Sequence, residues 1–160
     1  MAPPVVRVGI AAVIHDPSTN KMIFGTRRGS HGSGTIQFPG GHLDMGETWF
    51  ACAERETFEE TGLVVKAKKL LAATNDVFEQ ENKHYITLFI LCERVDDQEP
   101  LVLEPEKCEG WFWKSWSDVR DLMSGGSGGN GSGSGQQRGQ KFFLPIMNLL
   151  RDHPDIESLM

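Results

Sequence analysis

Three glutamates in one short segment have the spacing of a metal-binding helix face. Glu56, Glu59 and Glu60 lie in residues 48–61, for which the sequence predicts a helix. At about 100° per residue, positions i, i+3 and i+4 bring their carboxylates to one face. Like charges that crowd together raise one another's pKa unless a cation lies among them, and Mg²⁺ accepts carboxylate oxygens together with water and substrate phosphates. The segment therefore indicates a divalent-metal site that meets a polyphosphate.

The same segment belongs to a longer pattern of glycines, glutamates and an arginine. Residues 41–63 resemble the Nudix box, Gly-x5-Glu-x7-Arg-Glu-U-x-Glu-Glu-x-Gly-U, in which U is a bulky aliphatic residue. The fixed positions are filled by Gly41, Glu47, Arg55, Glu56, Glu59, Glu60, Gly62 and Leu63. Only Thr57 departs from the pattern, and because Thr keeps a β-branch and one methyl group we expect a small change in packing there. A merely solvated acidic helix is the alternative, but it leaves unexplained the glycines and the aromatic residues Trp49, Phe50 and Phe58, which we expect to be buried.

Composition indicates one soluble globular domain over residues 1–160. A chain of this length can bury a core without disulfides or a structural metal. The net charge of −6 and the absence of a long basic cluster argue against binding of long nucleic acid, whereas a small anionic substrate met through a metal fits both. The N-terminal sequence has no charged region followed by a cleavage site, and no apolar run is long enough to span a bilayer, so we expect a cytoplasmic protein that does not bind membranes.

The three cysteines are odd in number and show no CxxC spacing. Cys52 lies in the predicted metal-binding helix and Cys92 in a strand-like run, and Cys108 is the third. This pattern favours packing thiols in a reducing compartment over a disulfide or a catalytic thiol.

Apolar periodicity and turn-forming residues predict the other elements. Strands are expected at residues 5–14, 21–26, 36–38, 68–75, 84–93 and 111–113, with residues 84–93 in the centre of the sheet. Helices are expected at residues 117–123, with Ser117 as the cap, and at 142–150, with Pro145 in the first turn. Strands with helices on both sides predict an α/β fold, an α/β/α sandwich with a mixed central sheet, which is also the Nudix fold that the resemblance implies. Residues 124–140 are rich in Gly and Ser and cannot bury a core, so we predict a disordered loop insertion within the domain.

The Nudix resemblance also implies roles for the residues of the box. It implies Mg²⁺, or Mn²⁺ in its place, and an arginine that orients the glutamates by pairing with the first Glu of the box. Metal ions bound there lower the pKa of a water molecule, a carboxylate takes its proton, and a phosphoanhydride is cleaved. Carried over residue by residue, the metal ligands are Gly41, Glu56, Glu59 and Glu60, and the catalytic residues are Glu47, Arg55, Glu59, Glu60 and Glu109. Glu109 corresponds to an additional Glu of some members, with a solvent-facing loop acid as an equal alternative, and the identity of the general base stays open.

Outside the box the chain is similar to one branch of the Nudix family, in residues 24–63, 84–90 and 104–116. That branch contains MutT-homologue-type nucleoside triphosphate diphosphatases of animals that accept thiopurine nucleotides. Its plant relatives are described as acting on dihydroneopterin triphosphate, oxidised guanine nucleotides or isopentenyl diphosphate. The resemblance implies a homodimer and a substrate pocket. The matching pocket positions are Arg27, Gly40, His42, Thr87, Phe143 and Leu144.

These observations leave three functions open. The first is Mg²⁺-dependent cleavage of a nucleoside triphosphate, a purine nucleotide or an oxidised or modified one, to monophosphate and pyrophosphate. The second keeps the chemistry but acts on a pterin triphosphate or a prenyl diphosphate; Gln37, His84 and Thr87 are polar side chains that favour a nucleobase or pterin over a prenyl chain. The third is a catalytically silent module that binds a nucleotide, against which stands the presence of all four glutamates of the box.

Overall fold

The computed structural model describes residues 3–125 and 141–160 of the chain. The predicted loop insertion at residues 124–140 therefore lies outside the described residues, apart from Ser124 and Gly125. The elements in chain order are β1 (Val6–Asp16), β2 (Lys21–Arg27), β3 (Ile36–Gln37), β4 (Gly40–His42), α1 (Trp49–Thr61), β5 (Val65–Phe78), η1 (Glu79–Glu81), β6 (Lys83–Arg94), β7 (Cys108–Lys114), α2 (Trp116–Met123), α3 (Leu144–Asp152) and η2 (Ile156–Leu159).

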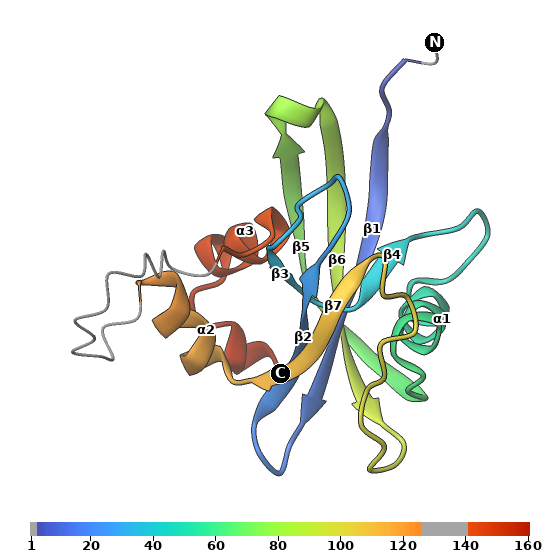
Figure 1. Ribbon diagram of the computed structural model, residues 1–160, viewed down its shortest axis with the longest axis vertical. Coiled ribbons are helices and arrows are strands. Elements are labelled where there is room, and N and C mark those ends of the chain that lie inside the picture. The colour runs from blue at the N-terminus through green and yellow to red at the C-terminus, as the bar shows by residue number, and fades with distance from the viewer. Residues whose placement is uncertain (1–2, 126–140) are drawn as a thin grey trace.

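A mixed sheet of seven strands forms the middle layer of the described structure (Figure 1). Its main path runs β3-β2-β1-β6-β5, with β4 paired to β1 and β7 paired to β2. β1 and β6 are parallel, and the other pairs are antiparallel. β1 changes partner along its length: Gly9 to Ala11 face β4, whereas His15 and Asp16 pair with β2. The predicted interior position of residues 84–93 is confirmed, because β6 lies between β1 and β5.

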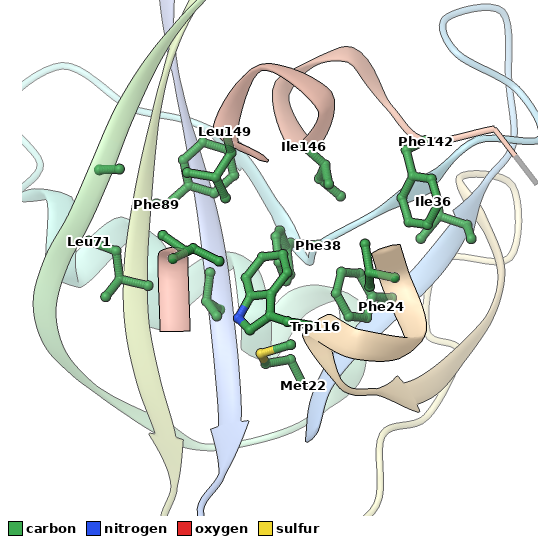
Figure 2. Close-up of a cluster of buried hydrophobic side chains, with 14 of the residues drawn as sticks. Met22, Phe24, Ile36, Phe38, Leu71, Phe89, Trp116, Phe142, Ile146 and Leu149 are labelled. Carbon is green, nitrogen blue, oxygen red and sulfur yellow. The ribbon is translucent and has the colours of Figure 1, made fainter. Parts of the chain in front are cut away.

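Helices cover both faces of this sheet, so the predicted α/β/α sandwich is confirmed. α1 lies on one face, and α2 and α3 lie on the other (Figure 1). Cys52 and Ala53 of α1 join the apolar cluster on their side of the sheet. The larger cluster lies under α2 and α3, where Trp116, Ile146 and Leu149 pack against strand residues (Figure 2). Removal of this apolar surface from water is the main contribution to folding.

The aromatic residues of α1 are not buried, and the expectation for them was wrong. Trp49, Phe50 and Phe58 are 45%, 38% and 57% exposed. The helix instead meets the sheet through small residues, which allow a close approach: Cys52, Ala53, Thr57 and Thr61. Phe58 lies on the far side of the helix from this small-residue face, and the other two aromatic residues are in the first turn.

The predicted cap of α2 was also wrong by two residues. Ser115, and not Ser117, caps the helix: the Ser115 Oγ accepts a hydrogen bond from the Asp118 backbone N at 3.1 Å, and the Asp118 carboxylate accepts one from the Ser115 backbone N at 3.0 Å. This reciprocal capping box begins the helix at Trp116, which is buried in the larger core cluster.

α3 begins later than predicted. Phe142 forms a parallel bridge with Ile36, and the Phe143 backbone N donates to the Ile36 carbonyl at 2.9 Å. The chain is therefore extended at this point and becomes helical only at Leu144, with Pro145 in the first turn as predicted. This bridge seats the segment before α3 at the edge of β3.

One buried hydroxyl of α1 has no hydrogen-bond partner among the residues that the structure describes. Thr57 is fully buried and its Oγ1 is unpaired, whereas an unsatisfied buried polar group destabilises a protein by about 1–3 kcal/mol. We therefore expect Thr57→Val, which keeps the β-branched shape, to raise the free energy of unfolding by about 1 kcal/mol in urea titration.

A matched control lies one turn away in the same helix. The Thr61 hydroxyl donates to the Thr57 carbonyl at 2.6 Å and accepts from the Leu63 backbone N at 3.1 Å. Thr61→Val removes both bonds and is expected to destabilise the protein. Equal effects of the two substitutions would show that the unpaired hydroxyl is not the cause.

Candidate active site

α1 has well-defined ends, and these set the position of its acidic residues. Thr48 caps the first turn, because its hydroxyl accepts from the Ala51 backbone N at 3.1 Å. Gly62 ends the helix in the left-handed conformation, with φ of 76°, and its N–H donates to the Phe58 carbonyl at 2.9 Å. The helix therefore matches the predicted 48–61 segment, with Thr48 as the cap.

Two glycines of β4 allow α1 and β1 to approach closely. A Cβ atom at Gly40 would lie 2.0 Å from the Ile10 carbonyl oxygen, and one at Gly41 would lie 2.3–2.5 Å from the carboxylate atoms of Glu56. Any side chain at either position would force the backbone or the carboxylate to move. The Gly-Gly pair is therefore required by the packing of the acidic face against β4.

Arg55 is the centre of the acidic cluster. Its Nε lies 2.7 Å from Glu47 Oε2, and its terminal nitrogens lie 2.9 Å from Glu56 Oε1 and 3.2 Å from Glu59 Oε2. A further ion pair reaches Asp44 at 3.3 Å. The hydrogen bonds that Arg55 donates lower the pKa of Glu47 to about 2, and the same bonds raise the pKa of Arg55. The pairing of Arg55 with the first Glu of the box, which the Nudix resemblance implied, is present.

Glu60 lies apart from this arginine. Among the described residues its one hydrogen bond is from the Gly40 backbone N, at 3.2 Å. Burial raises the pKa of Glu60 to about 8, and burial also raises the pKa of Glu56. In both cases burial removes water from the charged form of the carboxylate, although Glu56 keeps Arg55 as a partner at 2.9 Å.

Both carboxylates line a cavity of about 420 Å³, a volume in the range of small-molecule sites. The cavity is walled by residues from β1, β2, β4, α1, β5, β6 and the start of α3. Of the predicted site residues, the lining includes Arg27, Gly40, Gly41, His42, Glu56, Glu60, Thr87 and Phe143. The fold thus brings residues from across the sequence to one place.

The aromatic part of the cavity surrounds one histidine and one arginine. The Arg27 guanidinium lies over the Phe143 ring at 4.1 Å from its centroid, and its Nε donates to the His31 carbonyl at 3.0 Å. The His31 ring contacts Phe78 and Phe143 edge-on and stacks on Tyr85. These rings contact one another and form an aromatic cluster in the cavity wall, with the Arg27 cation against the Phe143 face.

Several predicted site residues lie outside the cavity lining. Glu47 and Glu59 contact Arg55 instead. Leu144 is not among the lining residues. His84 is also absent from the lining, and its ring forms a hydrogen bond with the Asn75 side chain. Glu109 is about half exposed and lies 3.7 Å from Arg28. Pro145 and Ile146, and not Leu144, line the cavity from α3.

Sequence reasoning missed three polar residues behind the cavity wall, which are Thr74, Asp76 and Asn148. Asp76 on β5 accepts hydrogen bonds from Thr74, Thr87 and Asn148. The predicted strand ended at residue 75, so Asp76 was left in a loop. Its place two residues after Thr74 in a run of alternating burial was the signal that could have found it.

The acidic part of the cavity fits a divalent cation. In the described part of the chain, no group of three or more His, Cys, Asp or Glu side chains is gathered closely enough to hold a metal alone. Two partly buried carboxylates facing a cavity nevertheless suit Mg²⁺, which keeps water ligands and takes further oxygens from substrate phosphates. The residues that could hold it are Glu56 and Glu60, with Glu59 close by on α1.

Thiol chemistry is not supported. Cys52, Cys92 and Cys108 are all buried and free, and burial raises the pKa of Cys52 and of Cys92 to about 12. The packing role predicted for these thiols is confirmed.

In the residues that the structure describes, no helix is long and apolar enough to cross a membrane.

The depressed pKa of Glu47 predicts how stability depends on pH. Arg55 holds that pKa at about 2, with the Asp44 backbone N and the Cys52 thiol as further partners, whereas an unfolded chain titrates near 4.3. The ionised carboxylate therefore stabilises the fold above about pH 4.3, and this contribution disappears as the pH falls towards 2.

We expect Glu47→Gln to lower the free energy of unfolding at pH 7 by about 1 kcal/mol and to flatten its decline between about pH 4.5 and 2.5. Urea titrations across this range measure both effects. An unchanged slope in the variant would contradict the role given to the pair of Glu47 and Arg55.

Comparison with known proteins identifies the family. Residues 5–128 match the NUDIX domain model. The chain is 31% identical over 123 residues to an RNA pyrophosphohydrolase of Erwinia tasmaniensis, covering 65% of this chain and 67% of that protein. It is 36% identical over 73 residues to an ADP-ribose pyrophosphatase of Methanocaldococcus jannaschii, covering 45% and 43%.

Solved structures agree with this match. A MutT Nudix hydrolase of Burkholderia pseudomallei superposes with a TM-score of 0.62 at 25% identity, covering 71% of this chain and 86% of that one. A Nudix hydrolase of Nitrosomonas europaea gives 0.66 at 18% identity, covering 94% and 90%, and supports the fold alone. Motif, fold and matched relatives together establish that the chain belongs to the Nudix family, as a MutT-like hydrolase.

Proposed function

We propose that this chain is a Mg²⁺-dependent hydrolase that cleaves nucleoside triphosphates to a monophosphate and pyrophosphate. The observation that carries the proposal is the composition of one cavity. Its lining combines two partly buried carboxylates with elevated pKa values and an aromatic cluster beside an arginine. A phosphate chain and a flat base need these two environments side by side.

The phosphate chain would lie between the carboxylates and the cations of the cavity. A Mg²⁺ ion at this place would supply positive charge beside the phosphates and acidity to a water molecule. Glu56 and Glu60 would hold the ion, and Arg27, Arg28 and Lys107, which also line the cavity, would offset phosphate charge. The oxygen of the water forms a bond to phosphorus, the bond from that phosphorus to its bridging oxygen breaks, and a carboxylate accepts the proton.

The base would lie in the cavity against the aromatic cluster of His31, Phe78, Tyr85 and Phe143, all of which line it. Thr87 and Gln37 also line the cavity and supply polar groups. A prenyl chain could make no hydrogen bond with these groups, whereas a heterocycle could, which favours a heterocyclic substrate. The similarity to pyrophosphatases of RNA ends and of ADP-ribose is in keeping with a nucleotide-type diphosphate.

Product analysis across a panel tests the proposal. The panel contains the natural NTPs and dNTPs, 8-oxo-dGTP, 6-thio-dGTP, dihydroneopterin triphosphate, isopentenyl diphosphate, ADP-ribose and a 5′-triphosphorylated RNA, each with and without Mg²⁺. We expect monophosphate and pyrophosphate from purine triphosphates, only with the metal. If only the pterin or prenyl compound is cleaved, the proposed substrate is wrong and that compound class takes its place. If folded protein turns over none of the compounds, the catalytically silent module is favoured.

A pair of glutamate variants tests the assignment within the site. We expect Glu60→Gln to leave the melting temperature close to that of the wild type and to reduce turnover by about 100-fold or more. Glu109→Gln, which alters an exposed carboxylate outside the cavity lining, is expected to keep most of the activity. The reverse ranking would move the base or metal ligand from α1 to the start of β7.

A further inference from the structure

A buried carboxylate lies behind one polar side chain of the cavity. Asp76 on β5 is 0% exposed and does not line the cavity. Its Oδ2 accepts hydrogen bonds from Thr87 Oγ1 at 2.6 Å and from Thr74 Oγ1 at 3.0 Å, and its Oδ1 accepts one from Asn148 Nδ2 at 2.9 Å. All three donors are themselves buried. Three donors converge on this carboxylate, so it acts only as an acceptor.

This arrangement fixes the direction of the Thr87 hydroxyl. A hydroxyl group has one hydrogen and two lone pairs, and here the hydrogen is bonded to Asp76. Thr87 lines the cavity, so the group that it presents there is a pair of electrons and not a hydrogen. Gly9, the β1 residue opposite Thr87, has no side chain to occupy the space in front of the hydroxyl; even a Cβ there would lie 3.8 Å from Oγ1.

We propose that Asp76 is a positioning residue that sets the base preference of this cavity: by holding the Thr87 hydrogen it makes the cavity select a heterocycle with an N–H donor over one with only ring-nitrogen lone pairs. The inference rests on the proposed nucleotide substrate. A base that brings a lone pair to Thr87 leaves two acceptors facing each other in a site that excludes water. A site built to meet a hydrogen-bonding group discriminates strongly against an analogue that lacks it.

Replacement of the carboxylate by an amide should reverse this polarity. In Asp76→Asn, the amide oxygen remains the acceptor for Asn148, and the amide NH₂ then faces the two threonine hydroxyls. The Thr87 oxygen would accept from that NH₂, and its hydrogen would turn towards the cavity. The shape of the side chain is kept, while the hydroxyl changes from acceptor to donor.

A second exchange should restore the original direction. In the double variant Asp76→Asn with Asn148→Asp, the carboxylate stands on α3 and accepts from the amide NH₂ on β5. The amide oxygen on β5 is then free to accept from both threonines, as the Asp76 carboxylate does in the wild type. Thr74→Val is the matched control, because Thr74 bonds to the same Oδ2 but does not line the cavity.

The test compares inosine triphosphate with purine riboside triphosphate. The hypoxanthine ring carries an N–H at N1, whereas unsubstituted purine carries a lone pair there and no N–H donor on either ring. We expect the wild type to prefer inosine triphosphate by about tenfold in kcat/KM. Asp76→Asn should bring this ratio to about one or below, the double variant should restore it, and Thr74→Val should leave it unchanged.

The outcomes separate a role in base preference from a role in folding. A fall in kcat/KM that is equal for both substrates, with an unchanged ratio, would overturn the proposal, as would a wild type without preference or an equal effect of Thr74→Val. Thr87→Val provides a second route if Asp76→Asn does not fold: it removes the acceptor and should also bring the ratio to about one, and an unchanged ratio would count against the proposal.

The proposed function can fail separately from this inference. If the wild type turns over neither triphosphate, hydrolysis of nucleoside triphosphates is excluded. The same ratio is then measured as dissociation constants of inosine monophosphate and purine riboside monophosphate, by calorimetry. A tenfold ratio that disappears in Asp76→Asn would still support the role of Asp76, and absence of binding or of a preference would overturn it.

Discussion

One guanidinium organises the acidic face on which the rest of the site depends. Arg55 contacts four carboxylates, those of Asp44, Glu47, Glu56 and Glu59. Without a cation among them, these groups would repel one another. Because the planar guanidinium presents five N–H donors in fixed directions, it can satisfy several acceptors at once, which an ammonium group does less well.

The arginine also divides the carboxylates into two groups. Glu47 has its charge fully compensated and its pKa lowered to about 2, whereas Glu60 is left with one backbone donor and a pKa raised to about 8. The first group holds the loop before α1 against the helix. The second group, to which Glu60 belongs, faces the cavity, where a cation that arrives with the ligand would balance the carboxylate charge. Glu56 belongs to both groups, because it lies 2.9 Å from Arg55 and also lines the cavity.

Much of this arrangement was predictable from the sequence because it is local. The cap at Thr48, the left-handed Gly62 and the i, i+3, i+4 glutamates all lie within one helix and its ends, where short-range geometry decides the outcome. The exposure of the aromatic residues Trp49, Phe50 and Phe58 was not predictable in this way. Small side chains such as Cys52 and Ala53 took the sheet-facing positions, and only the approach of the helix to the sheet determines that choice.

The non-local parts of the site were outside the reach of pattern reasoning without a family resemblance. The aromatic cluster around His31 is formed by side chains from the loop after β2, the β5–β6 hairpin and the segment before α3. The Phe142–Ile36 bridge that brings this segment to the sheet is a contact between residues far apart in sequence. No periodicity in either segment encodes the pairing, so the extended start at Phe142 was read as helix.

Glu60 and Asp76 show how the fold assigns different tasks to two carboxylates near one cavity. Asp76 receives three hydrogen bonds from side chains, so its charge is satisfied by the protein and its influence reaches the cavity only through the Thr87 hydroxyl. Glu60 receives one from a backbone N–H and has its pKa raised by burial. A satisfied buried acid makes a rigid wall with a fixed pattern of acceptors. In the proposed function, the charge of the unsatisfied Glu60 would be completed by a cation and its phosphate ligand. Recognition of the base and binding of the phosphates would then rest on opposite uses of the same functional group.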